Sequence, residues 1–148
     1  VDWVLDINGG YRHDPADLAG FFPHLESYDC VFGSRFSFGG RIENTKLGRL
    51  IFSKGGTTVA NMVLGTKLTD MTSGFQMFRK KTLEWVLSRG LRSKYHFLQT
   101  EIKFHCRDFK IKEVPIKYKI GSGRIKIHVI YDAVSTLFVL AFSRLKLY

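Results

Sequence analysis

The segment that most constrains the fold is the apolar run at residues 1–8, which ends in Asp6, Ile7 and Asn8 and is followed by the pair Gly9 and Gly10. A short apolar run bounded by glycines is typical of a buried strand that feeds a loop. Because side chains alternate along a strand, Asp6 and Asn8 share one face. Ligands of open α/β sheets lie at the carboxyl ends of strands. The segment therefore predicts a site for a hard cation that carries a phosphate, and we expect the chain to begin in the middle of a domain.

Short apolar runs alternate with helix-like segments along the rest of the chain. Strands are expected at residues 30–32, 76–78 and 111–118, and helices at 14–25, about 47–63, 82–88, 97–109 and 126–148. Pro115 places the strand at 111–118 on a sheet edge or at a bulge. A chain of 148 residues is long enough for one core. The alternation predicts a single α/β layer fold.

The helix expected at 14–25 has a clear start and one apolar face. Asp14 is suited to capping and Pro15 to the first helical position. Apolar residues then recur at helical spacing and predict one buried face, which comprises Leu18, Phe21, Phe22 and Leu25.

The net charge of +10 predicts an anionic partner, namely nucleic acid, phosphorylated metabolites or an acidic membrane surface. Nucleic acid is the least favoured, because most of the 13 Phe lie on apolar faces and not among the basic residues. The most apolar stretch, residues 127–142, is short and contains Asp132, so we expect it not to span a membrane. Residues 126–148 form an amphipathic helix that either packs on the domain or rests on the membrane interface.

Polar residues that suit phosphate chemistry stand at strand ends and in loops. Arg49 and Ser53 are four residues apart and share a helical face, where they offer a guanidinium and a hydroxyl to one phosphate. For the basic set Arg35, Arg41, Arg49 and Arg124, a solvated surface and phosphate binding both remain open. The segment at 70–75 is either a self-closed structural turn or part of a site.

Glu101, at the start of a helix, is either a surface residue or a site residue. The five histidines have no metal-ligand spacing and are interpreted as surface or packing residues. Cys30 and Cys106 also lack such spacing and are interpreted as small buried residues in a reducing compartment.

Nine short motifs occur in one order along nearly the whole chain. They are Leu5-Asp6-Ile7-Asn8, His13-Asp14-Pro15, Gly33-Ser34-Arg35, Gly40 to Asn44, Arg49-x-x-x-Ser53, Asp70 to Arg79, Phe97-x-x-x-Glu101, Glu113-Val114-Pro115-Ile116 and Gly121-x-x-Arg124. In this order they resemble the later half of a family 2 glycosyltransferase, in the branch of dolichol-phosphate mannosyltransferases and polyprenyl-phosphate glycosyltransferases.

The resemblance implies a fold and a division of the chain. It implies a GT-A-like (Rossmann-like) three-layer sandwich whose N-terminal nucleotide-binding strands are missing. Residues 1–125 would be a partial GT-A catalytic domain, and residues 126–148 the terminal helix.

The resemblance also implies a role for each site residue. Asp6 and Asn8 would hold Mg²⁺ or Mn²⁺ on the diphosphate of a nucleotide sugar. The residues implied to hold the lipid phosphate are Arg35, Arg49 and Ser53, with Arg124 on a loop that closes over the phosphates. The three implied catalytic acids are Asp6, Asp70 beside the acceptor and Glu101 near the sugar.

The activity implied is inverting transfer of mannose or glucose from GDP-mannose or UDP-glucose to a polyprenyl (dolichyl) phosphate, at the cytoplasmic face of a membrane. This chain has Asn8 where the family has a second Asp, which lowers the charge offered to the cation, and Gly10 where it has Gln. We expect the 148-residue chain alone to have little activity. Two alternatives remain open: a family 2 transferase with a saccharide acceptor, and a degenerate basic module that binds lipid or nucleic acid.

Overall fold

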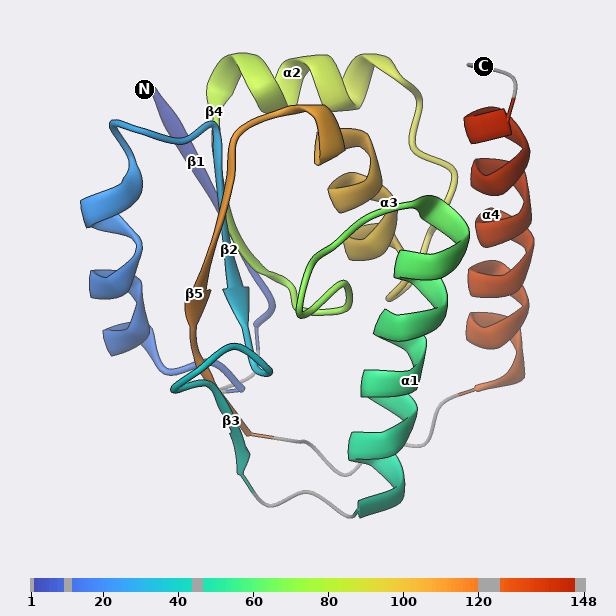
Figure 1. Ribbon diagram of the computed structural model, residues 1–148, viewed down its shortest axis with the longest axis horizontal. Helices are drawn as coiled ribbons and strands as arrows, with labels where there is room; N and C mark the ends of the chain where they lie inside the picture. Colours follow the sequence, from blue (N-terminus) through green and yellow to red (C-terminus); the bar gives the residue numbers. More distant parts are fainter. Residues whose placement is uncertain (1, 10–11, 44–46, 120–125, 146–148) are drawn as a thin grey trace.

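The computed structural model describes residues 2–9, 12–43, 47–119 and 126–145, which form a mixed α/β fold (Figure 1). The strands are β1 (Trp3–Ile7), β2 (Cys30–Ser34), β3 (Arg41–Glu43), β4 (Phe75–Arg79), β5 (Ile111–Pro115) and β6 (Lys117–Lys119). The α-helices are α1 (Leu47–Leu64), α2 (Lys80–Ser88), α3 (Leu98–His105) and α4 (Ile127–Leu145). The 3-10 helices are η1 (Pro15–Gly20), η2 (Phe22–His24) and η3 (Cys106–Asp108).

Four of the described strands form a mixed sheet in the order β1-β4-β2-β5. β4 runs antiparallel to β1 and β2, whereas β5 runs parallel to β2. All five residues of β2 are buried because the strand lies inside the sheet and is covered on both faces. β5 is an edge strand of this sheet, which confirms the expectation from Pro115.

Apolar side chains pack in three clusters that follow the layers of the fold. One cluster, with Phe21 and Phe75, lies between the sheet and the 3-10 helices η1 and η2. A second, with Phe32, fills the other face under α2 and α3. A third joins α1, α3 and α4 through Leu64 and Leu140. This layering confirms the predicted α/β class and is compatible with a Rossmann-like fold.

The segment at 15–24 differs from the single amphipathic helix that its apolar spacing predicts. Asp14 does cap the segment, with Oδ1 accepting from the amide of Ala16 at 3.0 Å. The chain then forms two short 3-10 helices, because Pro23 lacks an N–H and its ring obstructs a continuous α-helix. Phe21 is consequently buried, whereas Phe22 is 56% exposed.

The helix α4 packs beside α1 at one edge of the molecule (Figure 1). Leu140 and Thr136 are buried at this contact, and Arg144 donates to the carbonyl of Val63 at 3.0 Å. By length and composition alone, α4 is long and apolar enough to cross a membrane. The predicted boundary at residue 125 lies outside the described residues, so the division into two units stays a prediction.

Candidate functional site

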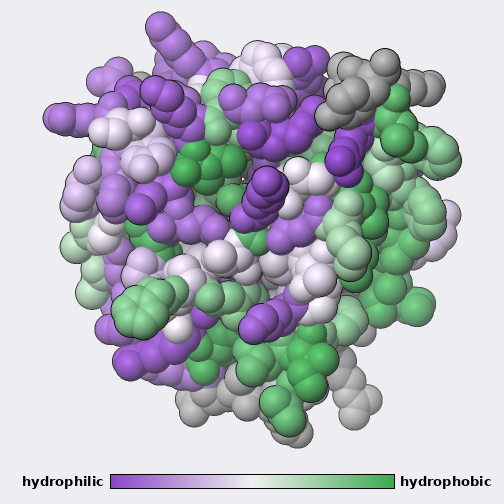
Figure 2. All heavy atoms as spheres, in the orientation of Figure 1, coloured by the Kyte–Doolittle hydropathy of each residue, from purple (hydrophilic) through white to green (hydrophobic). Residues whose placement is uncertain are grey.

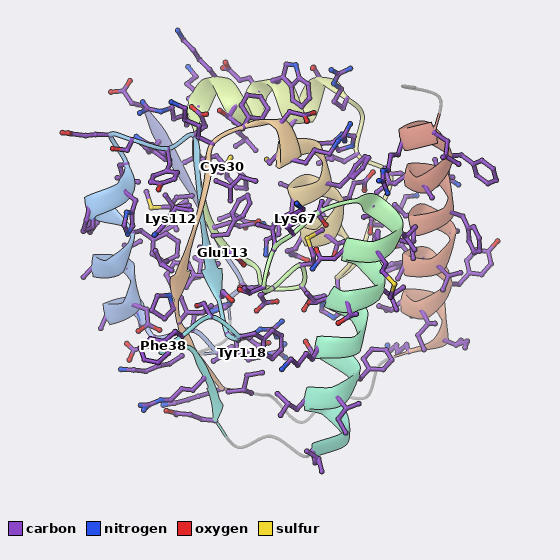
Figure 3. The ribbon with its side chains drawn as sticks, in the orientation of Figure 1. Cys30, Phe38, Lys67, Lys112, Glu113 and Tyr118 are labelled. Atoms are coloured by element: carbon purple, nitrogen blue, oxygen red, sulfur yellow. The ribbon has the colours of Figure 1, made fainter. Side chains whose placement is uncertain are left out.

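The centre of the candidate site is the turn at residues 69–74, which leads into β4. Four elements of the fold hold this turn. From β5, the Glu113 carboxylate accepts from the amides of Thr69 at 2.8 Å and Asp70 at 3.1 Å (Figure 3). From α1, the Thr57 hydroxyl accepts from the amide of Met71 at 3.2 Å. Residues of α3 and β2 complete the support, so the turn is fixed on several sides.

Arg35, directly after β2, forms a buried ion pair with Asp70. Its Nε donates to Oδ2 at 2.7 Å and its Nη2 to Oδ1 at 2.8 Å, while its backbone amide donates to Oδ2 at 3.0 Å. Arg35 is 8% exposed and Asp70 is completely buried. The Arg35 guanidinium carbon also lies 5.2 Å from the Tyr118 ring centroid. The two-pronged contact fixes the plane of the guanidinium.

Two hydroxyl groups lie beside this ion pair. Arg35 Nη2 also donates to Ser53 Oγ at 3.1 Å and to Thr72 Oγ1. Ser53 is on α1, and its hydroxyl lies 3.2 Å from that of Thr72. Both residues are only half-buried. We call Arg35, Ser53, Asp70 and Thr72 the Arg35 cluster; the structure thus brings together three of the predicted site residues.

The electrostatics of the Arg35 cluster favour an ionised Asp70. Burial alone would raise the pKa of Asp70, but the hydrogen bonds and charge of Arg35, together with the charge of Lys103, lower it overall. A carboxylate with a lowered pKa is a weak proton acceptor. The cluster is therefore built to hold a guanidinium in place.

Asp6 and Asn8 lie on and directly after β1, both half-buried. Asp6 Oδ2 accepts from the Gln76 side-chain amide at 2.9 Å, across the β1–β4 pair. The Asn8 side chain packs over Gly74, where a Cβ would overlap its amide group. We call Asp6 and Asn8 the β1 pair; it meets the 69–74 turn through Gly74.

The β1 pair fits a hard cation in part. A carboxylate and an amide oxygen are suitable ligands, and Mg²⁺ commonly takes one or two carboxylates and completes its shell with substrate phosphates and water. Among the described residues, no group of three or more His, Cys, Asp or Glu side chains is placed to hold a metal ion. A cation here would depend on oxygens that a bound ligand brings.

Three further predicted residues lie apart from this centre or outside the described part. Glu101 is buried on α3, and its two oxygens accept from the amides of Arg92 at 3.0 Å and Ser93 at 2.8 Å. The backbone of Arg49 is on α1, but its side chain is outside the described part. Arg124 lies outside the described residues. The roles predicted for all three stay predictions.

The structure adds two residues to the site that the sequence does not predict, Gln76 and Lys103. Gln76 bonds to Asp6, and Lys103 donates to carbonyls of the 69–74 turn. His13 is buried between the rings of Phe75 and Tyr118, which agrees with its interpretation as a packing residue. Lys103 gives no signal in the sequence, because a helical lysine is normally exposed. Gln76 lies opposite Asp6 only once the β1–β4 register is known.

Comparisons with known proteins support the resemblance drawn from the motifs. No protein-family model matches the chain. The chain is 27% identical over 138 residues to an undecaprenyl-phosphate mannosyltransferase of Micrococcus luteus. The aligned region covers 90% of this chain and 57% of the relative. It is 28% identical over 118 residues to a polyprenol monophosphomannose synthase of Mycolicibacterium smegmatis, covering 78% of this chain and 44% of the relative.

The resemblance to polyprenyl-phosphate glycosyltransferases is confirmed. The chain spans about half the length of these curated relatives. The similarity covers most of the described chain, including the Arg35 cluster and the 69–74 turn.

Proposed function

We propose that this chain forms the acceptor side of a polyprenyl-phosphate glycosyltransferase with a GT-A-like fold. The transferred sugar would be a hexose, mannose or glucose, donated by GDP-mannose or UDP-glucose. The observation that carries the proposal is the Arg35 cluster: a guanidinium fixed by Asp70, with two half-buried hydroxyls beside it. Similarity to relatives named for polyprenyl-phosphate mannosyl transfer supports it.

The chemistry proposed at the Arg35 cluster is the binding of an anionic acceptor. A polyprenyl phosphate is already ionised near neutral pH, so its oxygen attacks the anomeric carbon without a strong base. The new oxygen–carbon bond forms as the bond to the nucleoside diphosphate breaks, with inversion at that carbon. The main barrier is the electrostatic repulsion between the two anions, the acceptor phosphate and the donor diphosphate. Cations at the acceptor site reduce this repulsion.

Each residue then has a separate part. Arg35 and the Ser53 hydroxyl contact the acceptor phosphate, and Arg49 and Arg124 would be further contacts of that phosphate. Asp70 acts by holding Arg35, because its oxygens are occupied by guanidinium donors and its pKa is lowered. Asp6 and Asn8 would hold Mg²⁺ or Mn²⁺, which would offset the charge of the leaving diphosphate.

We infer that a membrane surface is the second partner, at the cytoplasmic face. Figure 2 shows apolar surface over α4 and over part of α1. Exposed large apolar side chains on α1 are Leu47, Ile51, Phe52, Val59 and Met62, and those on α4 are Ile127, Ile130, Tyr131, Val134, Phe138, Val139, Phe142 and Leu145. α1 thus contributes Ser53 to the Arg35 cluster, and it also presents apolar side chains on its exposed side. This arrangement suits an acceptor with a phosphate head and an apolar tail.

The decisive experiment assays the full-length protein with GDP-mannose and UDP-glucose, polyprenyl phosphate, and Mg²⁺ or Mn²⁺. We expect one donor to be consumed, and Ser53→Ala to raise the acceptor KM about tenfold through loss of a hydrogen bond to a charged group. Donor KM should stay unchanged. Ser88→Ala, at an exposed site on α2, is the matched control. Consumption of neither donor would contradict the proposal, and transfer to a saccharide alone would favour the alternative acceptor.

The membrane partner is tested separately by flotation with anionic vesicles. The double variant Phe138→Ser/Phe142→Ser should reduce the bound fraction severalfold, since both side chains are exposed on α4. Leu87→Ser, which removes an exposed leucine from α2, should leave flotation unchanged. Equal flotation of all three proteins would exclude α4 as the contact.

A further inference from the structure

Lys103 on α3 is a fully buried lysine that the proposed chemistry does not use directly. None of its surface is exposed, and its Nζ donates to the backbone oxygens of Asp70 at 2.7 Å and Ser73 at 2.9 Å. A buried ammonium is costly unless it is paired and hydrogen-bonded. The hydrogen bonds of Lys103 must therefore offset the cost of burying its ammonium group.

The two contacts of Lys103 are three residues apart in the 69–74 turn. One amine thus fixes the backbone at both Asp70 and Ser73, on either side of Thr72. On the same face of α3, the Thr100 hydroxyl donates to the carbonyl of Met71 at 3.1 Å. Three of the turn's carbonyls are bound by side chains of α3, which leaves the turn little freedom to rotate.

Asp70 is consequently held by two cations through different atoms. Lys103 binds its backbone oxygen, while Arg35 binds both oxygens of its carboxylate. Glu113 accepts from its amide at 3.1 Å. Two carboxyl groups, those of Asp70 and Glu113, thus lie in the same network as the two bases Arg35 and Lys103. The direction of the Asp70 side chain thus depends on a backbone that Lys103 anchors.

We propose that Lys103 is the positioning residue of the acceptor site. It anchors the 69–74 turn so that Asp70 and Thr72 hold Arg35 and Ser53 where the acceptor phosphate binds. The assignment of that phosphate rests on the proposed function, whereas the anchoring of the turn does not. Lys103 itself contacts no reacting atom in this assignment.

The test compares Lys103→Met with Lys110→Met in the full-length protein. Methionine keeps the apolar length of the side chain but leaves two carbonyls without a donor. Hydrogen exchange should accelerate at least tenfold at the amides of Arg35, Asp70 and Thr72, which bond within this network. Exchange in α2 should not change. Lys110→Met is the matched control, because the Lys110 side chain is exposed.

Kinetics supply the second readout. Lys103→Met should raise the acceptor KM about tenfold or more while donor KM changes less than twofold; a merely structural loss would lower kcat without this split. Lys103→Arg, which retains charge and donors, should recover part of the acceptor KM.

Unchanged exchange at the three amides would overturn the assignment, and so would equal loss toward donor and acceptor. If the wild type lacks transferase activity, the exchange result still decides whether Lys103 anchors the turn. If neither variant folds, the assignment is tested in the wild type. There, exchange of the same amides as fast as in exposed loops would overturn it, and strong protection of them would support it.

Discussion

The Arg35 cluster and the β1 pair differ in how completely the described chain builds each of them. Around Arg35, side chains from β2, α1 and the 69–74 turn converge, and the turn itself is bound by α3 and β5. The β1 pair has one side-chain hydrogen bond in the described part, from Gln76 to Asp6, and lies on an edge strand of the described sheet. The first region is preorganised, whereas the second depends on groups that a ligand brings.

Asp70→Asn should have the largest effect, because it removes the charge that balances a buried guanidinium. Breaking a buried ion pair on one side costs about 3–5 kcal/mol. We expect a loss of this size in the free energy of urea-induced unfolding, together with loss of acceptor binding. Asp108→Asn is the control: Asp108 is 74% exposed in its ion pair with Arg107, so less than about 1 kcal/mol is expected. Similar losses in the two variants would contradict the preorganised cluster.

Gly74→Ala tests whether the two regions are coupled. The new Cβ would overlap the Asn8 side-chain amide, so Asn8 must move. We expect about 1 kcal/mol of destabilisation, at the low end for overpacking because the overlapped atoms are the end of one half-buried side chain, and weaker Mn²⁺ binding in a calorimetric titration. Gly55→Ala is the control, since a Cβ there meets nothing within 4 Å and the residue lies inside α1. That variant should gain about 0.5–1 kcal/mol. Unaltered Mn²⁺ binding in Gly74→Ala would mean that the regions are independent.

His13 links the pH dependence of stability to the surroundings of Arg35. Burial, and then the nearby charge of Arg35, lower the pKa of His13 to about 4, against the partial opposition of Asp70. Between pH 6.5 and 4, His13 is therefore protonated in the unfolded chain but neutral in the folded chain. Stability should fall as the pH drops through this window.

The measurement is the free energy of unfolding of wild type and His13→Phe at pH 7, 5.5 and 4. The variant should lose about 1 kcal/mol less than the wild type per pH unit in the steepest part of the window. His96→Gln, at an exposed position, should retain the wild-type slope. An unaltered slope in His13→Phe would show that His13 is not held neutral.

The two regions also differ in how far the sequence predicts them. Strand ends and glycines predict the β1 pair, because alternation along a strand is a local rule. The i, i+4 spacing of Arg49 and Ser53 likewise predicts a shared helical face. The partners of Arg35 are not local: Asp70 is 35 residues away and Lys103 binds the turn from another helix. Such contacts depend on how β2, α1 and α3 pack, which periodicity alone does not give.

The segment at 15–24 shows the opposite case, in which a local rule is overridden by another local rule. The apolar spacing of Leu18, Phe21, Phe22 and Leu25 predicts one helix face. Pro23 interrupts the backbone hydrogen bonds, so Phe22 turns outward. The apolar spacing therefore predicts the burial of Phe21, whereas the backbone limit imposed by proline decides the exposure of Phe22.

Asn8→Asp should have the smallest effect and sharpens the contrast most directly. A second carboxylate beside Asp6 raises the charge offered to a cation, so Mn²⁺ should bind severalfold more tightly. Without metal, two like charges on one strand face repel, and we expect a loss of a few tenths of a kcal/mol in stability. Added Mn²⁺ should reverse this loss, because a ligand that binds the folded state stabilises it. Gln99→Glu, which adds a carboxylate of the same shape on α3, is the control for added charge. If Asn8→Asp binds Mn²⁺ no better than the wild type, the β1 pair is not a cation site. The Arg35 cluster would then be the part of the proposed site that the described chain builds by itself.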